Sequence, residues 1–186
     1  MAIGAAPLPY TRPVSPMEAW FLVYPDSVPG VMHLFVRGTG VITGPQLADA
    51  VERAARSCPG TRLTRDGMTW KDSGRAPEVR ELPPGGLDLA ADPPDLHRPL
   101  MGDPGPTCEV LLSCQDGETR VVFRAFHGAL DGKGLMFWAE EVFRALRGEP
   151  LLGAPDAVSE AELLERLDAR GVTGSPGVEA DLAWPS

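Results

Sequence analysis

One short segment of this 186-residue sequence combines residue types that can do chemistry. An apolar, strand-like run at residues 120–126 leads directly into the glycine-rich turn HGALDG at residues 127–132. A histidine at the end of a strand is well placed to reach into a cleft, and a neutral imidazole can take a proton from a hydroxyl or an amine. His127 and Asp131 also have the spacing of local hydrogen bonding in a turn, so a general base and a structural histidine are both open interpretations.

The cysteines and the other two histidines form no second motif. Cys58, Cys108 and Cys114 are an odd set without CxxC spacing and without a histidine at metal-ligand spacing, so we expect buried free thiols in a cytoplasmic protein and no bound metal. His33 lies on the polar face of an alternating strand, where a surface or interface position is expected. His97 lies in a proline-rich stretch and is expected to be exposed.

Charge and composition exclude several classes of protein. The chain carries 26 acidic and 17 basic side chains, and a net charge of -9 disfavours a general nucleic-acid binder, which needs clustered lysine and arginine. No apolar run approaches the roughly 18 residues of a membrane span, and residues 1–13 lack the pattern of a secretory signal. The length fits a domain with one core, and 21 glycines and 20 prolines indicate many loops.

The elements that must position the motif can be predicted from capping signals and periodicity. Four helices are expected, each with a start signal or an apolar stripe, over residues 16–23, 43–58, 133–147 and 159–171. Five strands are expected at residues 31–37, 68–71, 78–82, 109–113 and 120–126, with a turn on Asp116-Gly117 and a long loop over residues 83–106. This order predicts an α/β sandwich in which helices flank a mixed, largely antiparallel sheet.

The motif and its surroundings resemble the superfamily of condensation domains and chloramphenicol-acetyltransferase-like proteins. The family motif H-H-x-x-x-D-G matches residues 126–132, except that its first histidine is Phe126 here. Other segments resemble family text in the same order over roughly residues 12–155: VSPME at 14–18, FVRG at 35–38 with TGPQL at 43–47, CPGTRLTR at 58–65, and FRALRGEPL at 143–151. The polar stretch 65–71 departs from relatives, which tend to be apolar there.

The resemblance implies a role for each matching residue. His127 matches the histidine that acts as general base when a hydroxyl or an amine attacks a thioester carbonyl. Asp131 matches an aspartate that faces away from the cleft and pairs with a buried arginine, for which Arg62 is the match. Gly132 matches a glycine that leaves room for a phosphopantetheine arm. The implied acyl donor is linked to phosphopantetheine on a carrier protein or to CoA, and no cofactor is bound permanently.

The same resemblance implies that the chain is one lobe of a larger assembly. Full members are about twice as long, with the active site between two similar lobes, and the D-F-G-W-G-like motif of their second lobe is absent here. We expect a chloramphenicol-acetyltransferase-like lobe over residues 1–155, followed at 156–186 by a short helix and a tail that lead to the second lobe. That partner would be a separate chain, a cleaved half or another copy, as in trimeric acetyltransferases.

Three functions remain open at this stage. The first, which we favour, is a condensation-type acyltransferase lobe in natural-product or nonribosomal-peptide biosynthesis, with His127 as its base. The second is a non-catalytic condensation-like lobe that docks a carrier protein or completes the site of a neighbour. The third is an unrelated α/β binding protein that carries the motif by chance, in which His127 and Asp131 would line no cleft.

Overall fold

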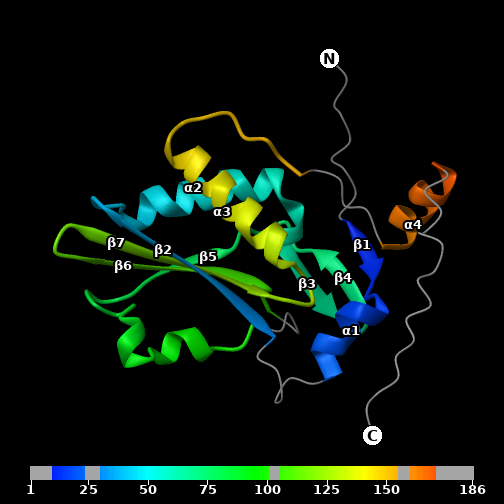
Figure 1. The fold of residues 1–186 in the computed structure, drawn as a ribbon, viewed down its shortest axis with the longest axis horizontal. Helices are drawn as coiled ribbons and strands as arrows, with labels where there is room; N and C mark the ends of the chain where they lie inside the picture. The colour runs from blue at the N-terminus through cyan, green and yellow to red at the C-terminus, as the bar shows by residue number, and fades with distance from the viewer. Residues whose placement is uncertain (1–9, 24–29, 101–104, 155–159, 171–186) are drawn as a thin grey trace, which may run out of the picture.

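The structure is a computed structural model that describes residues 10–23, 30–100, 105–154 and 160–170 (Figure 1). In these ranges the helices are α1 (Pro16–Val23), α2 (Gly44–Ser57), α3 (Gly132–Leu146) and α4 (Glu160–Ala169). The strands are β1 (Thr11–Pro13), β2 (Val31–Thr39), β3 (Leu63–Asp66), β4 (Thr69–Asp72), β5 (Glu78–Glu81), β6 (Cys108–Gln115) and β7 (Glu118–Phe126). The expected tail at 171–186 and the linker before α4 lie outside the described residues.

Two sheets form the frame of the molecule. The larger sheet has the strand order β2-β7-β6-β5, and the smaller has the order β1-β4-β3. All pairs are antiparallel except β5 with β6, which confirms the expected mixed and largely antiparallel character. Helices α2 and α3 lie together over one face of the larger sheet, and the smaller sheet lies beside α1 (Figure 1).

Helix positions follow from the capping signals. Thr43 and Gln46 form a complete capping box at the start of α2, with each side chain bonded to the backbone of the other residue. Ser15 and Glu18 do the same for α1 at 2.8 and 3.3 Å. The apolar stripe of α2 is buried against the sheet, as its period of about 3.6 residues requires, with Leu47, Ala50, Val51 and Ala54 in the core.

The central strand β7 presents different side chains to the two faces of its sheet. Toward the helices it buries Val121, Phe123 and Ala125, and the Phe123 ring makes an edge contact with Trp138 of α3 at a centroid distance of 5.2 Å. Toward the opposite face it buries Arg124. This alternation is the period of two that a strand imposes on its side chains.

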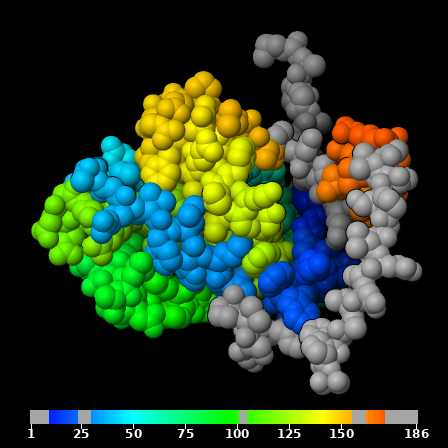
Figure 2. Space-filling view, viewed as in Figure 1, coloured from blue at the N-terminus to red at the C-terminus, as the bar shows by residue number. Residues whose placement is uncertain are grey.

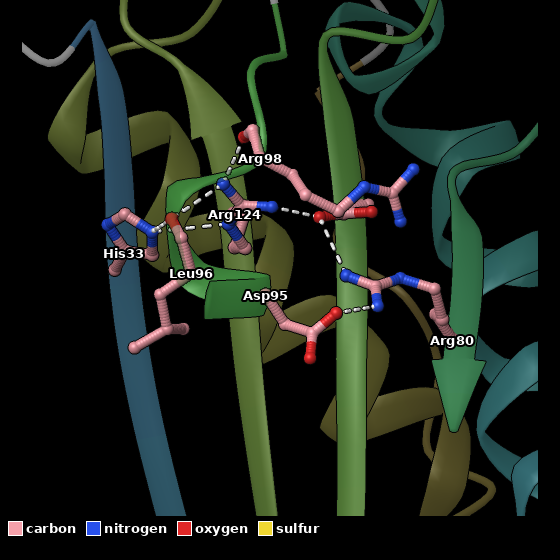
Figure 3. Close-up of polar contacts among 7 residues, drawn as sticks. His33, Arg80, Asp95, Leu96, Arg98 and Arg124 are labelled. Carbon is pink, nitrogen blue, oxygen red and sulfur yellow. Dashed lines mark hydrogen bonds and ion pairs between the residues drawn. The ribbon is translucent and has the colours of Figure 1, made fainter. Parts of the chain in front are cut away.

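A charged row on that opposite face holds the segment that follows β5. His33, Arg124 and Glu109 are direct cross-strand neighbours, and Arg80 of β5 adds a fourth polar side chain (Figure 3). Glu109 pairs with Arg124 and Arg80, and Asp95 pairs with Arg80. The Arg124 guanidinium also donates to the carbonyl oxygens of Leu96 at 2.8 Å and Arg98 at 2.5 Å, shown by dashed lines in Figure 3.

Several expectations are corrected by this arrangement. The stretch expected as a loop contains two short 3₁₀ helices, at Leu89–Ala91 and Pro94–His97, anchored by the charged row and by an apolar cluster of Leu82, Leu87, Leu111 and Val122. His33 is therefore a half-buried network residue, whereas His97 is exposed as expected. Strands β1 and β3 were not predicted, because neither has the apolar alternation that identifies a strand.

The described helices do not include a segment with the length and apolarity that crossing a membrane requires.

Candidate active site

The motif histidine is held at the end of β7 by α1 and by the start of β2. The backbone N–H of His127 donates to the carbonyl oxygen of Gly30 at 2.6 Å. Its imidazole stacks on the ring of Phe21 in α1, with a centroid distance of 4.3 Å and an interplanar angle of 10°. The α1 segment (blue) lies against the turn and the start of α3 (yellow-green) in Figure 2. These contacts fix one face of a half-buried imidazole.

The residue before the histidine anchors the turn in the protein interior. Phe126 is 1% exposed and packs with Leu63, Leu100 and Trp70, whose ring centroid lies 6.3 Å away. A Cβ at Gly128 would lie 2.5 Å from the Phe126 ring and 3.3 Å from the carbonyl oxygen of Glu18. Phe126, in place of the first motif histidine, therefore has a packing role, and Gly128 is needed for the close approach of α1.

The expected Asp131–Arg62 pair is wrong. Asp131 is exposed and is the N-cap of α3, where its carboxylate accepts the N–H of Gly134 at 2.6 Å. Arg62 instead donates to the carboxylate of Asp72 at 2.5 Å. The physical reason is proximity: Asp72 lies opposite Leu63 in the β3–β4 register, directly beside Arg62, while Asp131 satisfies a free N–H at the end of its own helix.

Gly132 is the exposed first residue of α3, and a Cβ built there would meet no atom within 4 Å. The space that the motif glycine is expected to leave is therefore present on this side of the helix, and its use by a phosphopantetheine arm stays a prediction. Gly134 is more crowded, since its Cβ would lie 2.9 Å from Leu130 and 3.1 Å from the carboxylate of Asp131.

A half-buried carboxylate, that of Glu18, stabilises α1, and the sequence pattern identified this residue only as part of a helix cap. Glu18 accepts hydrogen bonds from Arg12, from the backbone N–H of Ser15 and from Trp70 Nε1 at 3.2 Å. Burial alone would raise the pKa of Glu18, but these donors hold that pKa below its usual value. The same carboxylate thus caps α1 and ties it to β1 and β4, which keeps Phe21 against His127.

The thiols of Cys58 and Cys108 are buried as expected, whereas that of Cys114 is only partly buried. Burial raises the pKa of Cys58 to about 11 and that of Cys108 to about 12, so both stay protonated near neutral pH. Over the ranges that the structure covers, no group of three or more histidine, cysteine, aspartate or glutamate residues could hold a metal ion.

A cavity of about 210 Å³ lies beside the motif turn. It is bounded by the end of α2, the 3₁₀ turn Pro59–Arg62, β1 and its preceding residue, and α3. The motif segment contributes Ala129, Leu130 and Gly134 to its wall, whereas His127 and Asp131 are not among its lining residues. The imidazole and the cavity thus lie at the same turn but do not share one enclosed space within this chain.

Solved structures of condensation domains share this fold. No family model and no curated protein matches the sequence. The starter condensation domain of the rhizomide synthetase RzmA is similar with a TM-score of 0.64 and 18% identity, over 89% of this chain and 46% of that one. The tallysomycin biosynthesis protein TlmII is similar with a TM-score of 0.61 and 16% identity, over 87% of this chain and 43% of that one. The EpoB cyclization-docking bidomain from Sorangium cellulosum is similar with a TM-score of 0.59 and 16% identity, over 88% of this chain and 36% of that one.

These similarities confirm the expected fold. The chain has the α/β fold of a condensation-like lobe, with sheets flanked by helices. It spans less than half the length of the structures it matches.

Proposed function

We propose that this chain is one lobe of a condensation-type acyltransferase. It would transfer an acyl group from a thioester, carried by phosphopantetheine on a carrier protein or by CoA, to a hydroxyl or an amine. The observation that carries the proposal is the half-buried imidazole of His127, held at the end of β7 by the Gly30 carbonyl and the Phe21 ring. A base held in this way keeps its position without losing access to an acceptor.

In the proposed reaction, His127 takes the proton from the acceptor hydroxyl or amine while the acceptor atom attacks the thioester carbonyl carbon. A carbon–oxygen or carbon–nitrogen bond forms, and the carbon–sulfur bond breaks. The imidazolium then returns the proton to the departing thiolate, so the free thiol and the acylated acceptor are the products. The stacked Phe21 ring orients the imidazole throughout, and Gly132 leaves the open side of the turn for the thioester arm.

The site also needs a second lobe under this proposal. The matched structures are more than twice as long as the part that this chain covers, which supports a partner that supplies the opposite wall. We assign residues 1–155 to the lobe and residues 156–186 to a helix and tail that lead to this partner. A separate chain, a cleaved half and another copy of this chain would each fill that role.

Two observations favour a second candidate, a non-catalytic lobe that docks a carrier protein. Phe126 replaces the first motif histidine with a core residue, and Asp131 caps α3 in place of the expected ion pair with Arg62. A lobe of this kind would keep the fold and the docking surface but would not need the imidazole. The two candidates therefore differ in the effect of removing His127.

The test measures thioester consumption by the chain, alone and with a polypeptide that carries the missing half, using acyl-CoA and acyl-carrier donors. Removing a general base typically costs about 10²- to 10⁴-fold in rate, so His127→Ala should lose that much with little change in thermal stability. His97→Ala is the matched control, because His97 is exposed and remote in sequence from the turn. Equal rates for wild type and His127→Ala would contradict catalysis and favour the docking lobe.

A further inference from the structure

Helix α1, which carries the stacking ring of Phe21, has no fully buried apolar face. None of its eight residues, all of which the structure describes, is fully buried, and Met17, Trp20 and Val23 are exposed. Helices in proteins are usually held in place by the burial of an apolar face. The position of α1 against the motif turn must therefore depend on polar contacts as well.

Two of these contacts come from the smaller sheet and converge on Glu18. Arg12 binds both carboxylate oxygens, with Nη1 donating to Oε2 at 2.6 Å and Nη2 donating to Oε1. Trp70 Nε1 donates to Oε2 at 3.2 Å. Arg12 of β1 and Trp70 of β4 are direct cross-strand partners, so one pair of the smaller sheet supplies both donors. A bidentate arginine fixes the orientation of its carboxylate, and only 15% of the Arg12 side chain is exposed.

The path from Glu18 to the imidazole is short. Glu18 and Phe21 are three residues apart in α1, and residues at this spacing are neighbours on the surface of a helix. Phe21 stacks on His127 with a centroid distance of 4.3 Å. The backbone of Glu18 also approaches the motif turn, because a Cβ at Gly128 would lie 3.3 Å from its carbonyl oxygen. A displacement of α1 would therefore change the surroundings of the histidine directly.

We propose that Arg12 is a positioning residue for His127, acting through Glu18 and Phe21. The guanidinium fixes the carboxylate, the carboxylate ties α1 to the smaller sheet, and α1 holds the Phe21 ring against one face of the imidazole. The role of His127 as the base rests on the proposed function. The control of its ring orientation by Arg12 does not, so the smaller sheet would position this histidine in a non-catalytic lobe as well.

The orientation of the imidazole can be measured by NMR in the ¹³C-labelled full chain. A phenyl ring stacked face to face shifts the C–H proton signals of the imidazole upfield, because those protons lie over the ring. The His127 signals are identified by their absence in His127→Ala. Phe21→Leu removes the stacking ring, so the difference between its His127 signals and those of the wild type gives the full effect of the stack.

Arg12→Met keeps most of the aliphatic stem and removes the ion pair, so we expect its His127 signals to move most of the way to their position in Phe21→Leu. Arg12→Lys keeps the charge without the bidentate geometry and should give an intermediate position. Two variants in α2 are controls: Arg56→Met removes an exposed arginine–glutamate pair, and Val51→Ala destabilises the main core. Both controls should keep the wild-type signals.

Wild-type His127 signals in both Arg12 variants would overturn the proposal. Equal displacement of the signals in a control would also overturn it, because the signals would then report stability and not the ion pair. Identical signals in the wild type and Phe21→Leu would do the same, since no stack would exist for Arg12 to maintain.

The transfer assay separates this role from the proposed function. Misplacement of a reacting group by about 1 Å can cost about 100-fold in rate, so Arg12→Met should lower kcat by up to about 100-fold with little change in KM for the acyl donor. Transfer that depends on His127 but is unaffected by Arg12→Met would leave the proposed function intact and remove only the role of Arg12. Absence of transfer by the wild type would contradict the proposed function, and the NMR comparison would still decide whether Arg12 positions the ring.

Discussion

Strand β7 and the turn directly after it carry two basic side chains, three residues apart, whose surroundings differ. Arg124 is fully buried and bonded to Glu109, to two backbone carbonyls and to His33. His127 is half-buried, and across the described residues its ring has a stacking partner but no hydrogen bond to either nitrogen. The satisfied arginine stabilises the fold, whereas the proposed function needs the ring nitrogens of the histidine.

The two regions also differ in what holds them. The charged row around Arg124 is assembled from all four strands of the larger sheet and from the segment after β5 (Figure 3). The motif turn is held by α1, the Gly30 carbonyl and its own helix cap. We therefore expect substitutions in the first region to affect stability, and those in the second to affect activity more than stability.

The largest stability effect is expected at the buried arginine. Arg124→Met would leave Glu109 buried without its closest cation and should lower the free energy of unfolding by about 3–5 kcal/mol in urea denaturation. Arg37→Met is the matched control, since Arg37 lies on the adjacent strand with 72% of its side chain exposed, and should change stability by less than about 0.5 kcal/mol. Similar small losses in both variants would contradict the structural role of the charged row.

A smaller loss is expected at the motif aspartate. Asp131→Ala removes the cap of α3 and should cost about 1 kcal/mol, while Asp131→Asn should restore most of it. A double-mutant cycle adds Arg62→Ala. The effects of Asp131→Ala and Arg62→Ala should add within about 0.5 kcal/mol, because Arg62 pairs with Asp72. Coupling above about 1 kcal/mol would instead support the ion pair that the family resemblance implies.

The smallest expected effect is a dependence of stability on pH at His33. Burial lowers the pKa of His33, and the charges of Arg124 and His97 lower it further, while the Leu96 carbonyl and Glu109 oppose them. The unfolded chain thus binds this proton more readily, so the stability that His33 contributes is present above its unfolded pKa near 6.5 and is lost as pH falls below it.

Urea midpoints between pH 7.5 and pH 5 measure this effect. His33→Gln should flatten the loss of stability on acidification. His97→Gln removes only a minor repulsive charge near His33 and should keep most of the wild-type slope. Identical slopes in wild type and His33→Gln would show that protonation of His33 does not weaken the charged row.

Local signals were sufficient for the helices and for the strands of the larger sheet. The expected helix over 16–23 matches α1 at both ends, and the capping box at Thr43 correctly predicts the start of α2. These elements were predictable because capping and amphipathic periods are properties of neighbouring residues. Strands β1 and β3 were not, since both are short and partly polar and are stabilised by pairing with β4.

Partners that are distant in sequence were the main source of error. Glu141 lies in the predicted helix over residues 133–147, and no local pattern indicates that it is fully buried and accepts the N–H groups of Leu152 and Gly153 at 3.1 and 2.9 Å. Arg62 and Asp131 were paired by family resemblance, whereas geometry gives each a nearer partner. Ion pairing depends on distances of a few ångströms, which sequence spacing alone does not determine.

The sequence by itself determined the helices, the alternation of the central strands, and a histidine at a glycine-rich strand exit, because each depends on backbone periodicity and local caps. Only the tertiary structure decided what surrounds these features. The Phe21 ring beside His127, the charged row around Arg124 and the cavity beside the motif turn are each made by segments far apart in the chain. Such contacts arise only when packing brings those segments together, so no local pattern encodes them.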